Sequence, residues 1–180
     1  MQKNIGSTLA LYPMPLLVVG TMVEGKVNWV LVGHSGIIGH DRVMISLSKR
    51  HYTNRGIRET KLLSINFVDE TMLKKADYVG SVSGSKIDKS KVFEFHLGDS
   101  GAPIINQAPV VMECKLDDIY ETDMFDNFIL KIENTYVQEE NLNEKEKIDY
   151  TKYKPVLFEF PNYTYLKTGN TLGNCLNLEK

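Results

Sequence analysis

The sequence predicts a mainly β protein, a barrel or a sandwich with a few short helices. Several segments alternate apolar and polar residues at period two, most clearly Val43–Ser48 and Phe128–Val137. The connections between these segments are short and rich in turn residues. Helical spacing of apolar residues appears only in short pieces, the clearer of which follows Asp69.

The first strands form a hairpin. Pro15–Val23 is a nearly continuous apolar run with β-branched residues, which predicts a strand buried on both faces. Glu24-Gly25-Lys26 is a turn, so Lys26–Val32 returns as the second arm. The glycine-containing stretch His34–Arg42 reads as a loop.

The next strand, Val43–Ser48, has two distinct faces. Val43, Ile45 and Leu47 fall on one face, and Met44, Ser46 and Ser48 on the other. A basic turn follows, and Thr53 is a good N-cap for a short helix because its hydroxyl can accept from N–H groups of the first turn.

The rest of the chain continues this alternation of strands and turns. A helix is predicted from Asp69 to Gly80, with a polar loop after it at Ser81–Lys91. Asp118–Asp126 is predicted as a hairpin connection and the charged stretch Glu139–Lys154 as a solvated loop. The remaining predicted strands are Leu63–Val68, Pro109–Asp117, Phe128–Val137 and Val156–Phe160.

Composition limits the function classes. The 180 residues suit a single domain, 1–180, and 42% hydrophobic with 24% charged residues is ordinary for a globular protein. A net charge of −2 predicts no nucleic-acid partner, and no apolar run is long enough to span a bilayer. The two cysteines and four histidines show no metal-ligand spacing, so we expect no metal site and a reducing, cytoplasmic location.

One motif suggests a different chemistry. Gly98–Pro103 reads Gly-Asp-Ser-Gly-Ala-Pro, which resembles the nucleophile loop of trypsin-like serine proteases. No histidine upstream has the small-residue context of that family, so a glycine-rich turn is the simpler explanation. A serine hydrolase using Ser100 is kept as a remote alternative.

Polar groups converge after the Val43–Ser48 strand. Ser46 and Ser48 share a face, and continued alternation places Arg50 on the same side, shortly before the helix start at Thr53. Free N–H groups and the positive end of a helix favour an anion, so this stretch predicts a phosphate pocket.

A series of short pieces along the chain carries a family resemblance. No piece is specific alone, but their order resembles the flavin reductase-like FMN-binding family, and within it the flavoredoxin branch. The pieces are Asn28, Ile45-Ser46-Leu47-Ser48, Tyr52-Thr53-Asn54, Ser64-Ile65-Asn66, Ser83-Gly84, Asp88-Lys89, Ala102-Pro103-Ile104-Ile105, Glu113-Cys114-Lys115 and Tyr163-Tyr165-Leu166-Gly169-Gly173.

This resemblance implies a split β-barrel of Greek-key type, a homodimer, and FMN at the subunit interface. Asn28, with Leu31 and Val32 on the strand after it, would run beside the flavin ring. Lys89 would reach the flavin or its phosphate. The phosphate would be held by Ser46, Ser48, Arg50 and Thr53.

The implied function is electron transfer from NAD(P)H, through bound FMN, to a small-molecule or protein acceptor. Because the cofactor performs the chemistry, no catalytic side chain is expected. Many family members carry Gly-Asp-His where this chain has Phe125-Asp126-Asn127, which weakens the prediction of NAD(P)H oxidation more than that of FMN binding. The alternative is an FMN-binding electron carrier without its own NAD(P)H site.

Overall fold

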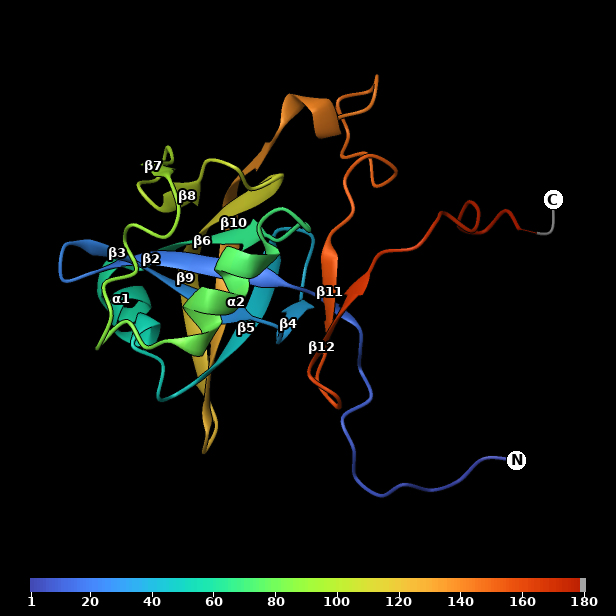
Figure 1. Ribbon diagram of the computed structural model, residues 1–180, viewed down its shortest axis with the longest axis horizontal. Coiled ribbons are helices and arrows are strands. Elements are labelled where there is room, and N and C mark those ends of the chain that lie inside the picture. The colour runs from blue at the N-terminus through green and yellow to red at the C-terminus, as the bar shows by residue number, and fades with distance from the viewer. Residues whose placement is uncertain (179–180) are drawn as a thin grey trace.

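The computed structural model describes residues 1–178 and is built on one curled antiparallel sheet (Figure 1). Its strand order is β3-β2-β6-β9-β10-β5-β4, so the sheet forms a half-barrel from strands far apart in the sequence. The strands are β2 (Leu17–Val23), β3 (Lys26–Val32), β4 (Ser35–Ile37), β5 (Arg42–Ser48), β6 (Leu62–Phe67), β9 (Val110–Glu121) and β10 (Phe125–Val137).

Smaller elements surround this sheet. Helix α1 (Thr53–Thr60) connects β5 to β6, and helix α2 (Leu73–Ser81) follows β6. The two ends of the chain meet in a second sheet of β1 (Met14–Pro15), β11 (Val156–Glu159) and β12 (Thr164–Lys167). The remaining pieces are the hairpin of β7 (Phe95–Leu97) and β8 (Pro103–Ile105), and a 3-10 turn at Glu139–Asn141.

Two apolar clusters lie on opposite faces of the sheet. Strand β2 contributes to both, with Val18 in the cluster around Trp29 and Val19 in the cluster around Phe128. This confirms the predicted strand buried on both faces. Helix α2 packs on the Trp29 cluster, while α1 adds Ile57 to the Phe128 cluster.

Period two also explains β5. Ile45 and Leu47 are buried in the Phe128 cluster, whereas Ser46 and Ser48 are half-buried on the opposite face. The first hairpin is confirmed as well, because Glu24 and Gly25 both adopt positive φ, at 51° and 77°, as a tight turn between twisted strands requires.

The hairpin between β9 and β10 is longer than predicted. Asp118–Asp126 is not a loop, because Asp126 and Asn127 pair with Leu47 and Ser46 of β5 and with Glu121 and Tyr120 of β9. Only Thr122–Met124 connects the two strands. Pairing on both sides keeps these polar residues in extended conformation despite their low strand propensity.

Two short strands lie outside the predicted ones. The stretch His34–Arg42 holds β4, whose pairing with β5 extends the sheet edge. The C-terminal stretch holds β12, paired with β11. Helix α2 begins at Leu73 rather than at Asp69, whose carboxylate accepts from Met72 N in the preceding turn at 3.0 Å.

Two further features bear on function. Cys114 is buried and Cys175 is exposed, and neither forms a disulfide. Across residues 1–178, every helix is too short or too polar to cross a membrane.

Candidate functional site

An apolar cavity opens where β3 and β5 end. Its volume is about 280 Å³, and we call it the Leu31 cavity. Leu31 and Val32 come from β3 and Ser46–Ser48 from β5, so the two strand ends form its floor. Its wall residues are Leu16, Leu31, Val32, Gly33, His34, Ser46, Leu47, Ser48, His51, Phe125, Phe158, Phe160 and Tyr163.

Aromatic rings from the C-terminal sheet close one side of the Leu31 cavity. The ring centroids of Phe160 and Tyr163 lie 4.9 Å apart, and those of His34 and Phe160 lie 5.5 Å apart. Phe158 packs directly on Gly33, where a Cβ would overlap its ring. The close approach of Phe158 to β3 therefore depends on the glycine.

The two serines of β5 have different surroundings. The Ser46 hydroxyl donates to Asn127 Oδ1 at 2.6 Å, so its proton is engaged across the sheet. The Ser48 oxygen is only a distant acceptor of Arg50 N, at 3.4 Å, and its hydroxyl proton remains available. Ser48 is therefore the better hydrogen-bond donor to a ligand.

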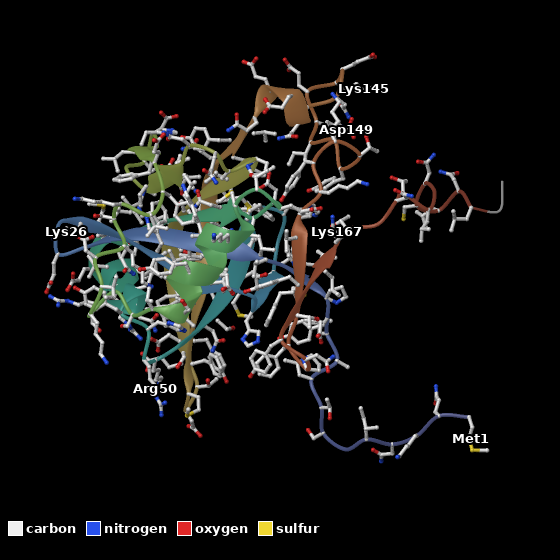
Figure 2. All side chains as sticks on the ribbon, viewed as in Figure 1. Met1, Lys26, Arg50, Lys145, Asp149 and Lys167 are labelled. Carbon is white, nitrogen blue, oxygen red and sulfur yellow. The ribbon has the colours of Figure 1, made fainter. Side chains whose placement is uncertain are left out.

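Arg50 lies beside this cavity but outside its wall. Its side chain is exposed and extends from the lower edge of the molecule (Figure 2). No carboxylate of residues 1–178 forms an ion pair with it, unlike Arg55 and Arg58 on the following helix. The charge of Arg50 is thus available to an anion that reaches the rim.

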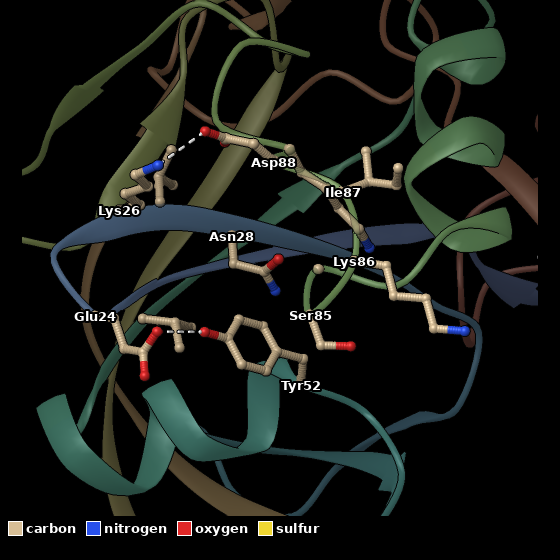
Figure 3. A pocket seen from close by; sticks show the side chains of 12 residues that line it. Glu24, Lys26, Asn28, Tyr52, Ser85, Lys86, Ile87 and Asp88 are labelled. Carbon is tan, nitrogen blue, oxygen red and sulfur yellow. Dashed lines mark hydrogen bonds and ion pairs between the residues drawn. The ribbon is translucent and has the colours of Figure 1, made fainter.

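A second, polar cavity lies at the other end of β3 (Figure 3). Its volume is about 320 Å³, and we call it the Asn28 cavity. Asn28 is 5% exposed and projects between Tyr52 and Ser85. The residues that line it are Val23, Glu24, Lys26, Val27, Asn28, Tyr52, Gly84, Ser85, Lys86, Ile87, Asp88 and Lys89.

Thr53 does not cap α1 as predicted. Tyr52 occupies the N-cap position in helical conformation and makes no side-chain cap bond. The Thr53 hydroxyl instead accepts from Asn28 Nδ2 at 2.7 Å, in a buried pair. The buried amide needs an acceptor, and this tertiary bond takes the place of the cap.

The start of α1 still presents backbone donors. Asn54 N donates to His51 O at 3.2 Å, and Arg55 N donates to Tyr52 O at 3.3 Å. The N–H groups of Tyr52 and Thr53 find no acceptor within residues 1–178. A helix N-terminus with free N–H groups attracts anions.

Lys89 links helix α2 to strand β3 next to the Asn28 cavity. The residue is 4% exposed, and its ammonium donates to Val79 O at 2.7 Å and to Trp29 O at 3.0 Å. These bonds join the last turn of α2 to β3. One of its three protons remains for another partner, and burial lowers its pKa to about 8.

Burial also affects the histidines of the Leu31 cavity. Burial lowers the pKa of His34, and burial together with the positive charge of Lys89 lowers the pKa of His51. The lowered pKa favours the neutral imidazole in both residues, and a neutral imidazole offers one N–H donor.

The predicted site residues fall into two neighbouring cavities along β3. Leu31, Val32, Ser46 and Ser48 line the Leu31 cavity. Asn28 and Lys89 line the Asn28 cavity, and Thr53 is bonded to Asn28, whereas Arg50 is exposed and lines neither cavity. Sequence reasoning missed the aromatic wall, although the stretch Phe158–Tyr165 carries four aromatic residues that could have indicated it.

The Gly98–Pro103 motif has a structural role. Glu113 is fully buried, and its Oε1 accepts from Ser100 N at 3.0 Å and from Ala102 N at 3.1 Å. The turn's N–H groups thus hold a carboxylate rather than forming an oxyanion hole. The only side-chain partner of the Ser100 hydroxyl in the described chain is Asn134, so the arrangement lacks a general base.

Comparison with known proteins agrees with this architecture. Residues 9–167 match the family model of the flavin reductase like domain. The structure is similar to flavoredoxin from Methanosarcina acetivorans, with a TM-score of 0.93 and 32% identity over 100% of this chain and 98% of that one. It is also similar to flavoredoxin of Desulfovibrio vulgaris (Miyazaki F), with a TM-score of 0.92 and 29% identity over 100% of both chains.

More distant similarities give the fold or a partial match. An FMN-binding protein from Thermus thermophilus has a TM-score of 0.82 at 22% identity, over 97% of both chains, and shows the shared fold alone. An uncharacterized protein of Aeropyrum pernix is 26% identical over 133 residues, which cover 70% of this chain and 50% of that protein. The chain thus spans about half the length of that relative.

The curled seven-stranded sheet and these similarities confirm the split-barrel prediction. The family match covers most of the chain, from β1 to the end of β12. The chain belongs to the flavin reductase-like family.

Proposed function

We propose that this protein binds FMN and works as a flavin-dependent oxidoreductase that passes electrons to an acceptor. The observation that carries the proposal is the Leu31 cavity, where an apolar floor meets an aromatic wall and His51, next in sequence to the free N–H groups that begin α1. Its place in a chain similar to flavoredoxins over its full length supports the same reading.

The residues present suit FMN chemically. Leu31 and Val32 offer an apolar surface for a flavin ring, which gains from contact with apolar and aromatic groups. The donors needed by a ribityl phosphate are the Ser48 hydroxyl, the neutral His51 ring and the N–H groups that begin α1. Arg50 at the rim adds the positive charge.

The Asn28 cavity would continue this binding surface. Asn28 is fixed by its bond to Thr53, and Lys89 by its bonds to two carbonyls, so both are held in place before a ligand arrives. A Cβ on Gly84 would overlap Asn28 Oδ1, so the glycine lets the loop close over Asn28.

Bound FMN would supply the redox chemistry, since it accepts electrons from a donor and passes them on. The chain's own residues would position the ring, bind the phosphate and keep water from the apolar face. We assign no catalytic side chain.

NAD(P)H is the proposed electron donor, and an FMN-binding carrier without its own NAD(P)H site is the second candidate. One observation favours the second candidate: this chain has Phe125-Asp126-Asn127 where many members of the family carry Gly-Asp-His.

The test uses the purified protein. A yellow protein with a flavin absorption spectrum, or saturable FMN binding by protein stripped of ligand, is the expected result. If FMN does not bind, the proposed function is wrong. Anaerobic addition of NADH or NADPH then separates the two candidates: rapid bleaching of the bound flavin supports the reductase, and an unchanged spectrum supports the carrier.

We also propose a homodimer in which both copies contribute to each flavin site. Support comes from apolar side chains on the terminal arms, where Leu11 is 73% and Leu172 is 97% exposed, and from Ile37 on edge strand β4 at 86%. Both arms extend away from the barrel (Figure 1), and large exposed apolar groups tend to be covered by a partner. Light scattering at micromolar concentration is expected to give twice the chain mass, and a monomer that retains FMN would contradict the proposal.

The two free cysteines are consistent with the reducing, cytoplasmic location that we propose.

A further inference from the structure

A third cavity adjoins the Leu31 cavity and has a different character. Its volume is about 500 Å³, and we call it the Tyr12 cavity. It shares Gly33, His34, Ser46, Phe125 and Phe160 with the Leu31 cavity, so a molecule in one lies beside a molecule in the other. Its other wall residues are Leu9, Leu11, Tyr12, Met14, Ser35, Met44, Thr122 and Asn127.

The wall of the Tyr12 cavity is aromatic and uncharged. The rings of Tyr12 and Phe160 are stacked, with an interplanar angle of 20° and centroids 6.2 Å apart. Within the described chain, no lysine, arginine, aspartate or glutamate lines it. Charged ligands would lose their hydration here without gaining an ion pair, so the cavity favours neutral ones.

Two polar atoms in this wall are buried without a partner. The Tyr12 hydroxyl and His34 Nε2 are both shielded from solvent, and neither has a hydrogen-bond partner in residues 1–178. A buried polar atom left unpaired is costly, and most in folded proteins are paired. Both atoms can therefore form a hydrogen bond with a group from outside the described chain.

The protonation states of the Tyr12 hydroxyl and the His34 ring indicate which ligand group they can bind. Burial, and then the nearby Tyr163, raise the pKa of Tyr12, so its hydroxyl stays protonated and can donate. Burial lowers the pKa of His34, so its ring is neutral and donates from Nε2 in the tautomer that carries the proton there. A ligand that matches these two groups carries an oxygen acceptor on an otherwise apolar ring.

We infer that the Tyr12 cavity binds a neutral aromatic compound bearing a ketone, aldehyde or quinone oxygen, held by the Tyr12 hydroxyl and His34. The binding itself is independent of flavin, and it rests on the proposed function only in that the molecule would then lie beside the FMN. Most of the wall comes from the barrel, and the N-terminal arm and the turn between β11 and β12 complete it with Tyr12 and Phe160.

Equilibrium dialysis of the purified full-length protein tests the inference with three probes of similar shape. 2-Acetylnaphthalene carries the carbonyl, 2-ethylnaphthalene lacks it, and 2-naphthoate carries a negative charge. We expect the ketone to bind about two- to tenfold more tightly than the hydrocarbon, which corresponds to one neutral hydrogen bond. We expect the carboxylate to bind at least about tenfold more weakly than the ketone, because the wall has no cation.

Variants assign the site. Tyr12→Phe removes only the hydroxyl and should reduce the preference for the ketone, because only His34 is left to bind its oxygen, while hydrocarbon binding stays unchanged. Tyr78→Phe, on the exposed face of α2, is the matched control and should behave like the parent. Met44→Trp should fill the cavity and weaken all three probes, and thermal unfolding checks that each variant is folded.

Equal binding of ketone and hydrocarbon, a ketone preference that Tyr12→Phe leaves undiminished, or no binding of any probe would overturn the inference. FMN binding is measured separately from the absorption spectrum. A protein that holds FMN but fails these probe tests refutes the inference alone, and one that passes them without binding FMN refutes the proposed function alone.

Discussion

Replacing Arg50 by alanine should weaken FMN binding without affecting riboflavin, which lacks the phosphate. Arg50 is exposed and forms no ion pair among the described residues, so its charge is free to meet a phosphate at the start of α1. A charge-assisted hydrogen bond contributes about 1.5–3 kcal/mol, but exposed ion pairs contribute only about 0.2–1 kcal/mol. A rim position falls between these, near 1.4 kcal/mol, which corresponds to a roughly tenfold higher Kd for FMN.

The assay is fluorescence titration of FMN and of riboflavin into protein stripped of ligand. Arg55→Ala is the matched control, because Arg55 lies on α1 but is already paired with Glu24 and with Glu59, the latter at 2.8 Å. It should leave both affinities unchanged. Because salt screens exposed charges, the loss of FMN affinity caused by Arg50→Ala should also be smaller at high salt.

The result that would refute this reasoning is a loss of riboflavin affinity equal to the loss of FMN affinity. No loss of either affinity would also refute it. In both cases the phosphate does not meet Arg50, and the turn before α1 is only a polar connection.

Three further variants probe the supporting structure. Thr53→Ala should weaken the binding of FMN and of riboflavin alike and lower the free energy of unfolding by about 1–3 kcal/mol, because Asn28 loses its buried acceptor. Thr53→Ser keeps the hydroxyl and should restore the binding of both ligands and the stability. An effect on FMN binding alone would contradict this. Ser100→Ala should leave FMN binding and stability nearly unchanged. Glu113→Ala should lower the free energy of unfolding, measured in urea, by about 1–3 kcal/mol for each buried donor that loses its acceptor. The stability of the parent relative to Lys89→Met should rise between pH 8 and pH 10.5, because the unfolded lysine binds a proton there that the buried one has lost; a pH-independent difference would show that Lys89 is not buried as described.

The barrel strands could be predicted because their pattern reflects local burial. The alternation in Val43–Ser48 survives in the structure, since Ile45 and Leu47 pack in the core while Ser46 and Ser48 face the cavity. The long apolar run before the first turn likewise became a strand with both faces covered. In these elements one physical requirement, apolar burial, dictates both the sequence and the structure.

The predictions were wrong where a contact with residues distant in the sequence determines the local structure. Thr53 has the side chain of a helix cap, but the buried amide of Asn28 takes its oxygen. Asp126 and Asn127 have turn composition, but neighbouring strands on both sides extend them. The aromatic wall was missed for the same reason, because Phe158 and Phe160 reach the site through pairing of β11 with β1, which no local pattern reveals.

The pairing of β1 with β11 has a consequence for biosynthesis. Leu16 N donates to Val156 O, and Val156 N donates to Val68 O. Residues near the start of the chain can therefore complete these hydrogen bonds only when residues near its end are present. The chain emerges from the ribosome N-terminus first, and long-range pairing is the slow part of folding. The barrel strands can therefore assemble during translation, while the walls of the Leu31 and Tyr12 cavities form only after the C-terminal segment is released. A nascent chain stalled before Val156 would carry most of the sheet but no complete site, so the proposed flavin binding would begin only once the chain is finished.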